Sequence, residues 1–173
     1  LLLNAARATS KARKLEGQHP TFTEDQLKTY GETFARLLRC ATVSVKDTHD
    51  DTEFAKLRAV VEEDFPLLHQ KAERRILAED CWMYKIPGKD TSRNILLMSH
   101  HDVVPADTDC TRPAFDGIIK AGKVYGRGAA DTKGSLCAIL FGMEEMLREG
   151  IQPPVNVYIV SSHNEELGGN GMA

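Results

Sequence analysis

The segment spanning residues 133–149 constrains the fold most strongly, because it is a clear amphipathic helix set between two short apolar runs. Its apolar side chains recur every three or four positions, and Gly150 follows it as a helix stop. Residues 94–98 form the apolar run before it, and residues 155–160 form the run after it. Continuous apolar runs of this length are typical of strands that are covered on both faces. This order predicts a layered α/β domain in which helices pack against a largely buried sheet.

Four further elements are expected along the chain. A helix should begin after Thr23, because a glutamine three residues later completes a capping-box pattern. A second helix should run from about Asp51 until Pro66 ends or kinks it. Residues 76–86 are predicted to form one strand, and residues 118–125 a β-hairpin around a Lys-Ala-Gly-Lys turn.

The composition is that of an ordinary globular domain. The chain has 173 residues, of which 42% are hydrophobic and 27% are charged, and its net charge is −3. This length is enough for one domain with a sizeable core, and these proportions exclude a disordered tail. The mild negative charge argues against nucleic acid as a partner. We expect residues 1–20 to be a leader or linker and residues 21–173 to belong to one domain.

The four cysteines are Cys40, Cys81, Cys110 and Cys137, and no pair has the spacing of a zinc ribbon or thioredoxin-type site. Cys40 and Cys137 lie among apolar residues and are expected to be buried free thiols. Free thiols favour a reducing, cytoplasmic compartment over an oxidising one. The sequence does not assign the compartment, and an upstream signal or membrane segment stays an open alternative.

His100 and Asp102 follow the first apolar run and form the first of three polar clusters. Residues two apart in an extended segment project to the same side. A metal ion bound to one ring nitrogen of His100 would leave the other nitrogen to donate to Asp102, which fixes the ring. His101 projects to the opposite side and is not chosen as a ligand. The alternative is a loop histidine beside a surface acid.

Asp131 ends a Gly-Arg-Gly-Ala-Ala-Asp run just before the helix at 133–149. Glycines at positions 126 and 128 allow close backbone approach and unusual φ angles. A carboxylate held rigidly there can bridge two metal ions about 3.5–4 Å apart. The run does not match the third glycine of a dinucleotide-binding loop or the Gly-Lys-Ser/Thr of a P-loop. The alternative is a glycine turn in which Asp131 caps the following helix.

Glu165 and Glu166 follow the second apolar run and form the third cluster. Adjacent carboxylates repel one another unless a positive charge lies beside them. One can bind a metal ion while the other accepts a proton from an activated water. The alternative is a pair of solvated loop glutamates. In an α/β domain, ligands gather beyond the carboxyl ends of the strands, so the three clusters are expected to share one site.

Four motifs resemble the signature of the zinc-dependent aminoacylase/carboxypeptidase family. That family includes acetylornithine deacetylase, succinyl-diaminopimelate desuccinylase, glutamate carboxypeptidase and carboxypeptidase S. Residues 23–173 follow its amino-terminal order, and the motif wording is closest to the carboxypeptidase S branch. The motifs are Ser99-His100-His101-Asp102-Val103-Val104-Pro105, Pro113-Ala114-Phe115-Asp116-Gly117, the run from Tyr125 to Gly134, and Glu165-Glu166-Leu167-Gly168-Gly169.

The resemblance implies a role for each matched residue. His100 would bind one metal ion, with Asp102 behind it as the orienting partner. Asp131 would bridge both metal ions, and in the family the peptide bond after this aspartate is often cis. Glu166 would bind the second metal ion, and Glu165 would act as general base and then general acid. The fold implied is a three-layer α/β/α catalytic domain of the zinc-exopeptidase type, with only its amino-terminal part in this chain.

The resemblance also implies the reaction and the cofactors. The reaction would be hydrolysis of an amide or peptide bond next to an amino acid, as in a carboxypeptidase, a dipeptidase or an N-acyl-amino-acid deacylase. The substrate would be a small peptide or an N-acyl amino acid. Two divalent metal ions are implied, with zinc as the first choice and cobalt or manganese as alternatives.

The family's remaining ligands lie outside this chain. Its third carboxylate ligand follows the paired glutamates, its last histidine lies near the carboxyl end, and its lid and dimerisation domain is inserted between them. A longer parent would be active and homodimeric through that lid, whereas the isolated chain is expected to bind metal weakly and to be inactive, because zinc usually takes three or four protein ligands. The alternative is a non-catalytic relative that uses the scaffold for protein interaction.

Overall fold

The computed structural model describes residues 21–46, 48, 51–107 and 111–169. The predicted leader at 1–20 and the thiol of Cys110 lie outside the described residues. Among the helices that the structure describes, none is both long enough and apolar enough to cross a membrane.

Three helices lie in the amino-terminal third of the described chain. Helix α2 (Glu24–Leu38) begins with the predicted capping box, in which the Thr23 hydroxyl accepts from the Gln26 N–H and the Gln26 side chain accepts from the Thr23 N–H. Helix α3 (Asp51–Asp64) ends just before Pro66. Pro66 does not merely end that helix but begins another, α4 (Pro66–Lys71), where its fixed φ suits the first turn.

A four-stranded sheet forms the centre of the fold. Its strands are β1 (Glu73–Leu77), β2 (Cys81–Ile86), β3 (Asp90–His100) and β6 (Val155–Ser162). They lie in the order β1-β2-β6-β3, and only β3 and β6 run parallel. The parallel pair brings His100 opposite Ser162, so the segments that follow the two strands leave the sheet at the same edge.

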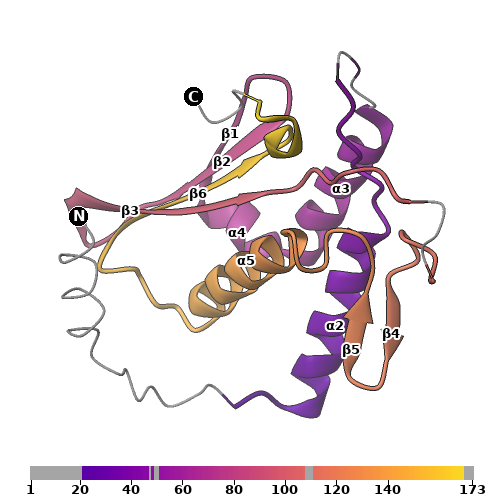
Figure 1. Ribbon diagram of the computed structural model, residues 1–173. Coiled ribbons are helices and arrows are strands. Elements are labelled where there is room, and N and C mark those ends of the chain that lie inside the picture. Colours follow the sequence, from indigo (N-terminus) through magenta and orange to yellow (C-terminus); the bar gives the residue numbers. More distant parts are fainter. Residues whose placement is uncertain (1–20, 47, 49–50, 108–110, 170–173) are drawn as a thin grey trace, which may run out of the picture.

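Helix α5 (Lys133–Arg148) connects the two parallel strands across one face of the sheet. In Figure 1 the helices α3, α4 and α5 gather on one side of the sheet, and the hairpin of β4 (Ile118–Lys120) and β5 (Lys123–Tyr125) lies beside α2. The core joins these helices to the inward side chains of β2 and β6. Its fully buried members include Leu37, Leu57, Phe65, Leu68, Leu136 and Leu140. The predicted α/β class is confirmed.

The prediction of one strand over residues 76–86 is wrong. The chain reverses at residues 78–80, where Ala78 adopts a positive φ of 50°, and β1 and β2 pair antiparallel on either side. The buried carboxylate of Asp80 fixes the turn by accepting from Trp82 Nε1 at 2.8 Å and from Arg58 of α3 at 2.5 Å. The turn contains no glycine or proline, so no local signal marked it.

The prediction that residues 94–98 are covered on both faces is also wrong. Strand β3 is longer than that run and lies at the edge of the described sheet, where its outer backbone is unpaired within the described residues. Ile95, Leu96 and Met98 are 47–54% exposed. Of the two apolar runs, only the one in β6 is largely buried as predicted, because β6 has a neighbouring strand on each side. The prediction that Cys40 and Cys137 are buried free thiols is confirmed.

Candidate metal centre

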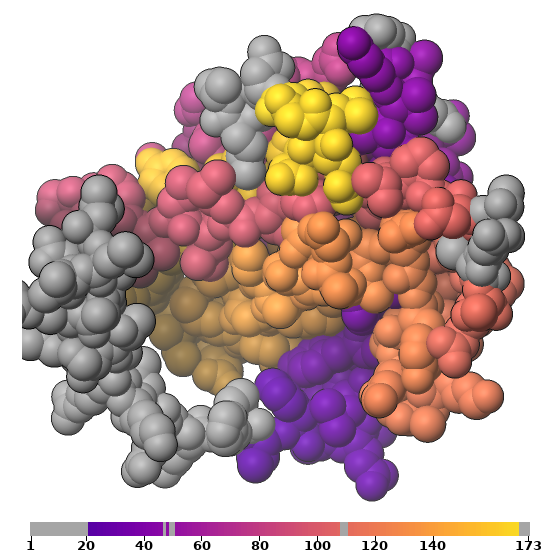
Figure 2. Space-filling model, viewed as in Figure 1, coloured from indigo at the N-terminus to yellow at the C-terminus, as the bar shows by residue number. Residues whose placement is uncertain are grey.

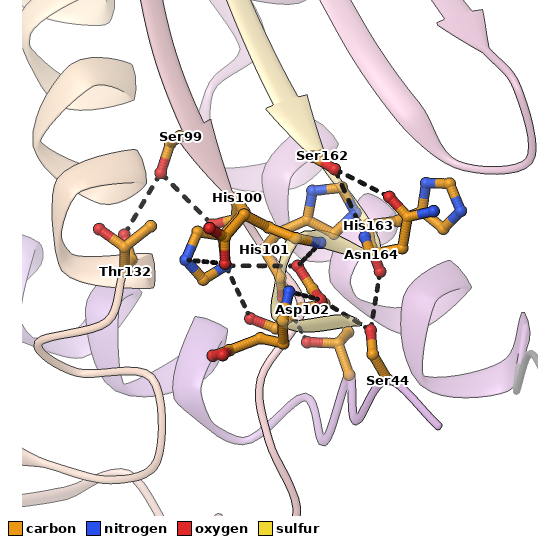
Figure 3. Close-up of polar contacts among 12 residues, drawn as sticks. Ser44, Ser99, His100, His101, Asp102, Thr132, Ser162, His163 and Asn164 are labelled. Atoms are coloured by element: carbon orange, nitrogen blue, oxygen red, sulfur yellow. Dashed lines mark hydrogen bonds and ion pairs between the residues drawn. The ribbon is translucent and has the colours of Figure 1, made fainter. Parts of the chain in front are cut away.

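Three segments meet where β3 and β6 end (Figure 3). They are the residues after β3, the loop before α5, and the short 3₁₀ helix η1 (Glu165–Leu167) after β6. In the space-filling view the red, orange and yellow surfaces of these segments adjoin on one face of the molecule (Figure 2). The structure therefore brings the three predicted clusters together.

The ring of His100 lies between Asp102 on its Nδ1 side and the carboxylates of Asp131 and Glu165 on its Nε2 side. Its Nδ1 lies 3.1 Å from the carbonyl oxygen of Asp102 and 3.3 Å from Oδ1 of the same residue. Its Nε2 lies 3.0 Å from Asp131 Oδ1 and 3.6 Å from Glu165 Oε2. The hydrogen bond to Asp102, reinforced by the one to Asp131 and opposed by burial, raises the pKa of His100 to about 9. A proton on Nε2 would compete with a metal ion for this nitrogen.

Asp102 is the buried centre of this network (Figure 3). Besides facing His100, its carboxylate accepts from the Ser44 hydroxyl at 2.8 Å. It also accepts from the backbone N–H groups of Glu165 at 3.2 Å and Glu166 at 3.1 Å. Burial opposes ionisation, yet the hydrogen bonds from His100, Ser44 and the Glu166 N–H lower the pKa of Asp102. Asp102 thus contacts the Nδ1 side of the His100 ring and also accepts from the backbone of the turn that carries both glutamates.

His101 points away from the site, as the alternation of the strand predicted. It is fully buried, and its ring stacks on Trp82 with the centroids 4.1 Å apart. Its Nδ1 lies 2.8 Å from the Ser161 hydroxyl oxygen, and burial lowers its pKa. His101 is therefore a neutral core residue.

Asp131 sits at the end of a tight loop. Gly128 in this loop has a φ of +83°, and a β-carbon there would lie 2.8 Å from Val103 Cγ1, so only glycine fits. The peptide bond from Asp131 to Thr132 is cis. Thr132 takes the N-cap position of α5, so Asp131 does not cap the helix and its carboxylate, 77% exposed, is free to face His100.

The two glutamates occupy η1, and Glu165 faces the same ring nitrogen of His100 as Asp131 does. The Glu165 carboxylate is 59% exposed, and one of its oxygens faces His100 Nε2. Glu166 is partly buried, and this burial, followed by the negative charge of Asp131, raises its pKa. One ligand atom from each of His100, Asp131 and Glu166 lies within 4.8 Å of the other two.

The charges of the site suit a bound cation. Three carboxylates surround one imidazole, and no lysine or arginine pairs with Asp131, Glu165 or Glu166 among the residues that the structure describes. An imidazole nitrogen with carboxylate oxygens is a donor set that zinc and related divalent ions accept. The residues present therefore fit a divalent metal ion.

Sequence reasoning missed the support from the segment that follows α2. The Ser44 hydroxyl also lies 2.9 Å from the His163 carbonyl oxygen, and the Thr42 hydroxyl donates to the His101 carbonyl at 2.5 Å. Backbone hydrogen bonds join Thr42 and Ser44 to Val103. These contacts join positions 59 to 119 residues apart, and a lone serine or threonine after a helix gives no local signal of them.

A family model describes the second half of the same chain. Residues 96–173, which contain all the clustered side chains, match the model of peptidase family M20/M25/M40. Residues 96–173 thus belong to this peptidase family. The resemblance to metal-dependent carboxypeptidases and acylases that the motifs predicted is thereby confirmed.

Relatives of this M20-family chain carry carboxypeptidase and acylase names. "Probable carboxypeptidase S-like 2" of Dictyostelium discoideum is 34% identical over the whole chain. "N-fatty-acyl-amino acid synthase/hydrolase PM20D1" of Mus musculus is 30% identical over 86% of the chain. The chain spans only 36% and 30% of the lengths of these two proteins.

Solved M20-family structures share the fold. The metallo-carboxypeptidase Sso-CP2 from Sulfolobus solfataricus matches 80% of this chain and 31% of its own with a TM-score of 0.66 and 26% identity. Human carnosine dipeptidase 1 matches 84% of this chain and 34% of its own with a TM-score of 0.70. At 19% identity the second likeness concerns the fold alone.

Proposed function

We propose that this chain is the amino-terminal part of a metal-dependent hydrolase that cleaves an amide or peptide bond next to an amino acid. The substrate class is small peptides or N-acyl amino acids, in keeping with the names of the relatives. The single observation that carries the proposal is the convergence of His100, Asp131 and Glu166 around one point, with Glu165 beside them.

We assign His100 to one metal ion, Glu166 to a second and Asp131 to the bridge between them, with zinc as the expected metal. Bound metal would polarise the scissile carbonyl and make a nearby water more acidic. Asp102, which is buried and hydrogen-bonded, contacts Nδ1 of His100 and so leaves Nε2 as the nitrogen that would bind the ion.

Glu165 is the proton carrier of the proposed reaction. Its carboxylate is exposed at the mouth of the site and accepts a proton as the water oxygen bonds to the carbonyl carbon. When the carbon–nitrogen bond breaks, the same carboxyl group returns that proton to the leaving amine. One residue therefore serves as base and then as acid.

The experiment that tests this proposal compares Glu165→Gln with the wild type in the full-length protein that contains this chain. Glutamine keeps the shape but cannot take a proton, so we expect hydrolysis of dipeptides or N-acyl amino acids to fall by roughly 10²- to 10⁴-fold. The matched Glu149→Gln change, at an exposed position just after α5, should leave the rate unchanged.

Two results would contradict the proposal. Retained hydrolysis in Glu165→Gln would remove Glu165 from the mechanism. A wild type that hydrolyses no dipeptide and no N-acyl amino acid would favour a non-catalytic scaffold that acts through protein interaction.

The 173-residue chain alone offers too few ligands for tight binding of zinc. Its zinc content after dialysis, measured by metal analysis, should therefore be substoichiometric.

A further inference from the structure

Lys133 is a fully buried lysine that the proposed reaction does not use. It is the first residue of α5 and follows Asp131 by two positions, yet its side chain turns away from the carboxylates into the protein. A buried ammonium group is costly unless it is well hydrogen-bonded, so its partners indicate what it does.

The ammonium group of Lys133 binds the end of α2. Its Nζ donates to the carbonyl oxygen of Cys40 at 2.6 Å and to that of Leu37 at 3.2 Å. Helix α2 ends at Leu38, where the helix dipole is negative, and the two carbonyls also accept backbone N–H groups, Leu37 from Cys40 at 3.3 Å and Cys40 from Thr42 at 2.9 Å. The cation therefore adds a second, charged donor to two buried acceptors at a helix carboxyl end.

The aliphatic stem of Lys133 packs under the loop that carries Asp131. A β-carbon added to Gly128 would lie 3.3 Å from Lys133 Cδ and 2.8 Å from Val103 Cγ1. The stem and Val103 thus both pack closely against the Gly128 backbone. Lys133 touches the Asp131 loop along its length and the end of α2 at its tip.

The segment after α2 also holds the other half of the site. Cys40 accepts from Lys133, Thr42 hydrogen-bonds the backbone on either side of Asp102, and Ser44 donates to the Asp102 carboxylate. Residues 40–44 are therefore a common platform, and Lys133 is the contact through which the Asp131 loop reaches it.

We propose that Lys133 is a positioning residue, which fixes the Asp131 loop on the 40–44 platform and so sets the separation of the Asp131 and His100 ligand atoms. The inference rests on the proposed metal site. A purely structural role predicts lower stability with unchanged metal affinity, whereas a positioning role predicts that affinity falls beyond the loss of stability.

The test compares Lys133→Met and Lys133→Arg in the full-length protein that contains this chain. Methionine keeps an unbranched stem but removes the ammonium donor, so the Leu37 and Cys40 carbonyls keep only their backbone donors. Arginine keeps the charge and the donors. We expect roughly a 10- to 100-fold loss of zinc affinity in Lys133→Met, as for other groups that orient metal ligands, and substantial recovery in Lys133→Arg. Affinity is measured by competition with a chromophoric chelator, and the cobalt(II) absorption spectrum should change in the methionine variant.

Leu68→Ala is the matched control. Leu68 is as fully buried as Lys133, but it lies in α4 and its side chain takes no part in the hydrogen bonds of residues 40–44. It should lower stability but leave zinc affinity within about twofold. If Lys133→Met does not fold, Lys133→Gln tests the same contact, since glutamine removes the charge but keeps an N–H donor.

The possible outcomes separate the role of Lys133 from the existence of the metal site. Zinc affinity within about twofold of the wild type in the folded variants, or an equal loss in Leu68→Ala, would overturn the role of Lys133 and leave the metal site standing. A wild-type protein that binds no zinc and no cobalt would overturn both the metal site and the positioning role.

Discussion

The two halves of the candidate metal centre are built differently. The His100 side chain is 9% exposed and that of Asp102 is fully buried, whereas the carboxylates of Asp131 and Glu165 are 77% and 59% exposed. The first half is part of the core, and its geometry is fixed when the chain folds. The second half consists of exposed acidic groups on tight turns, and its mutual repulsion is relieved only by a cation. The difference indicates that folding fixes the imidazole itself but, in the second half, only the turns, and that a bound metal ion would order the exposed carboxylates on those turns.

The largest effect is expected from Asp102→Ala, which attacks the buried half. It leaves the backbone N–H groups of Glu165 and Glu166 without an acceptor and removes the partner of His100, while the Ser44 hydroxyl keeps only the His163 carbonyl as acceptor. We expect the free energy of unfolding to fall by about 3 kcal/mol or more. Zinc affinity should also fall by roughly 10- to 100-fold. Urea denaturation and chelator competition measure the two quantities.

Ser44→Ala is the graded control for this change, because it removes one partner of Asp102 and should cost about 1 kcal/mol. A stability loss in Asp102→Ala no larger than that of Ser44→Ala would show that the buried half is not preorganised in the way described.

Asp131→Ala attacks the exposed half and should separate binding from folding. The lost ion pair with His100 is largely exposed on the aspartate side, so unfolding should change by less than about 1 kcal/mol. Zinc affinity should fall by roughly 100-fold, because a direct ligand is lost. Urea denaturation and chelator competition again measure the two quantities. A stability loss equal to that of Asp102→Ala would show that the two halves do not differ in their contribution to folding.

The last prediction concerns pH, and it arises where the two halves meet at His100. Its pKa of about 9 lies above the ordinary value of 6.5, so the folded, metal-free protein holds this proton more tightly than the unfolded chain. The resulting stabilisation is complete below pH 6.5 and is lost as pH rises to about 9. Zinc must displace the same proton, so zinc binding should tighten over that window.

Proton release on zinc binding checks this prediction by calorimetry in buffers of different ionisation enthalpy. About one proton per site should be released at pH 7 in the wild type, and fewer in Asp102→Asn, where the main cause of the raised pKa is gone. Zinc affinity that is flat between pH 6.5 and 9 would contradict it.

Local patterns predicted the elements whose signals are local. The capping box at Thr23, the hairpin at 118–125 and the end of α5 at Gly150 all came from residues within a few positions of one another. The reversal at Ala78 was missed because Arg58, from another element, holds the Asp80 carboxylate that stabilises it.

In the candidate site, too, the long-range contacts were the part that could not be predicted. The order of the clusters predicted that His100, Asp131 and Glu166 would meet, because parallel strands end at one edge of a sheet. The support beneath them, from Ser44 and Lys133, was not predicted, since it depends on how α2 packs against segments far along the chain. An apolar run alone likewise could not distinguish the central strand β6 from the edge strand β3.

That edge strand has a practical consequence for anyone who handles this chain in solution. Along β3, exposed apolar side chains such as Leu96 and Met98 flank backbone groups that are unpaired within the described sheet. A long, apolar, open edge is a template on which another strand can add, and natural proteins usually blunt such edges with charge or proline. The purified chain should therefore self-associate through β3 at high concentration, and a lysine at Leu96 would be a direct way to keep it monomeric.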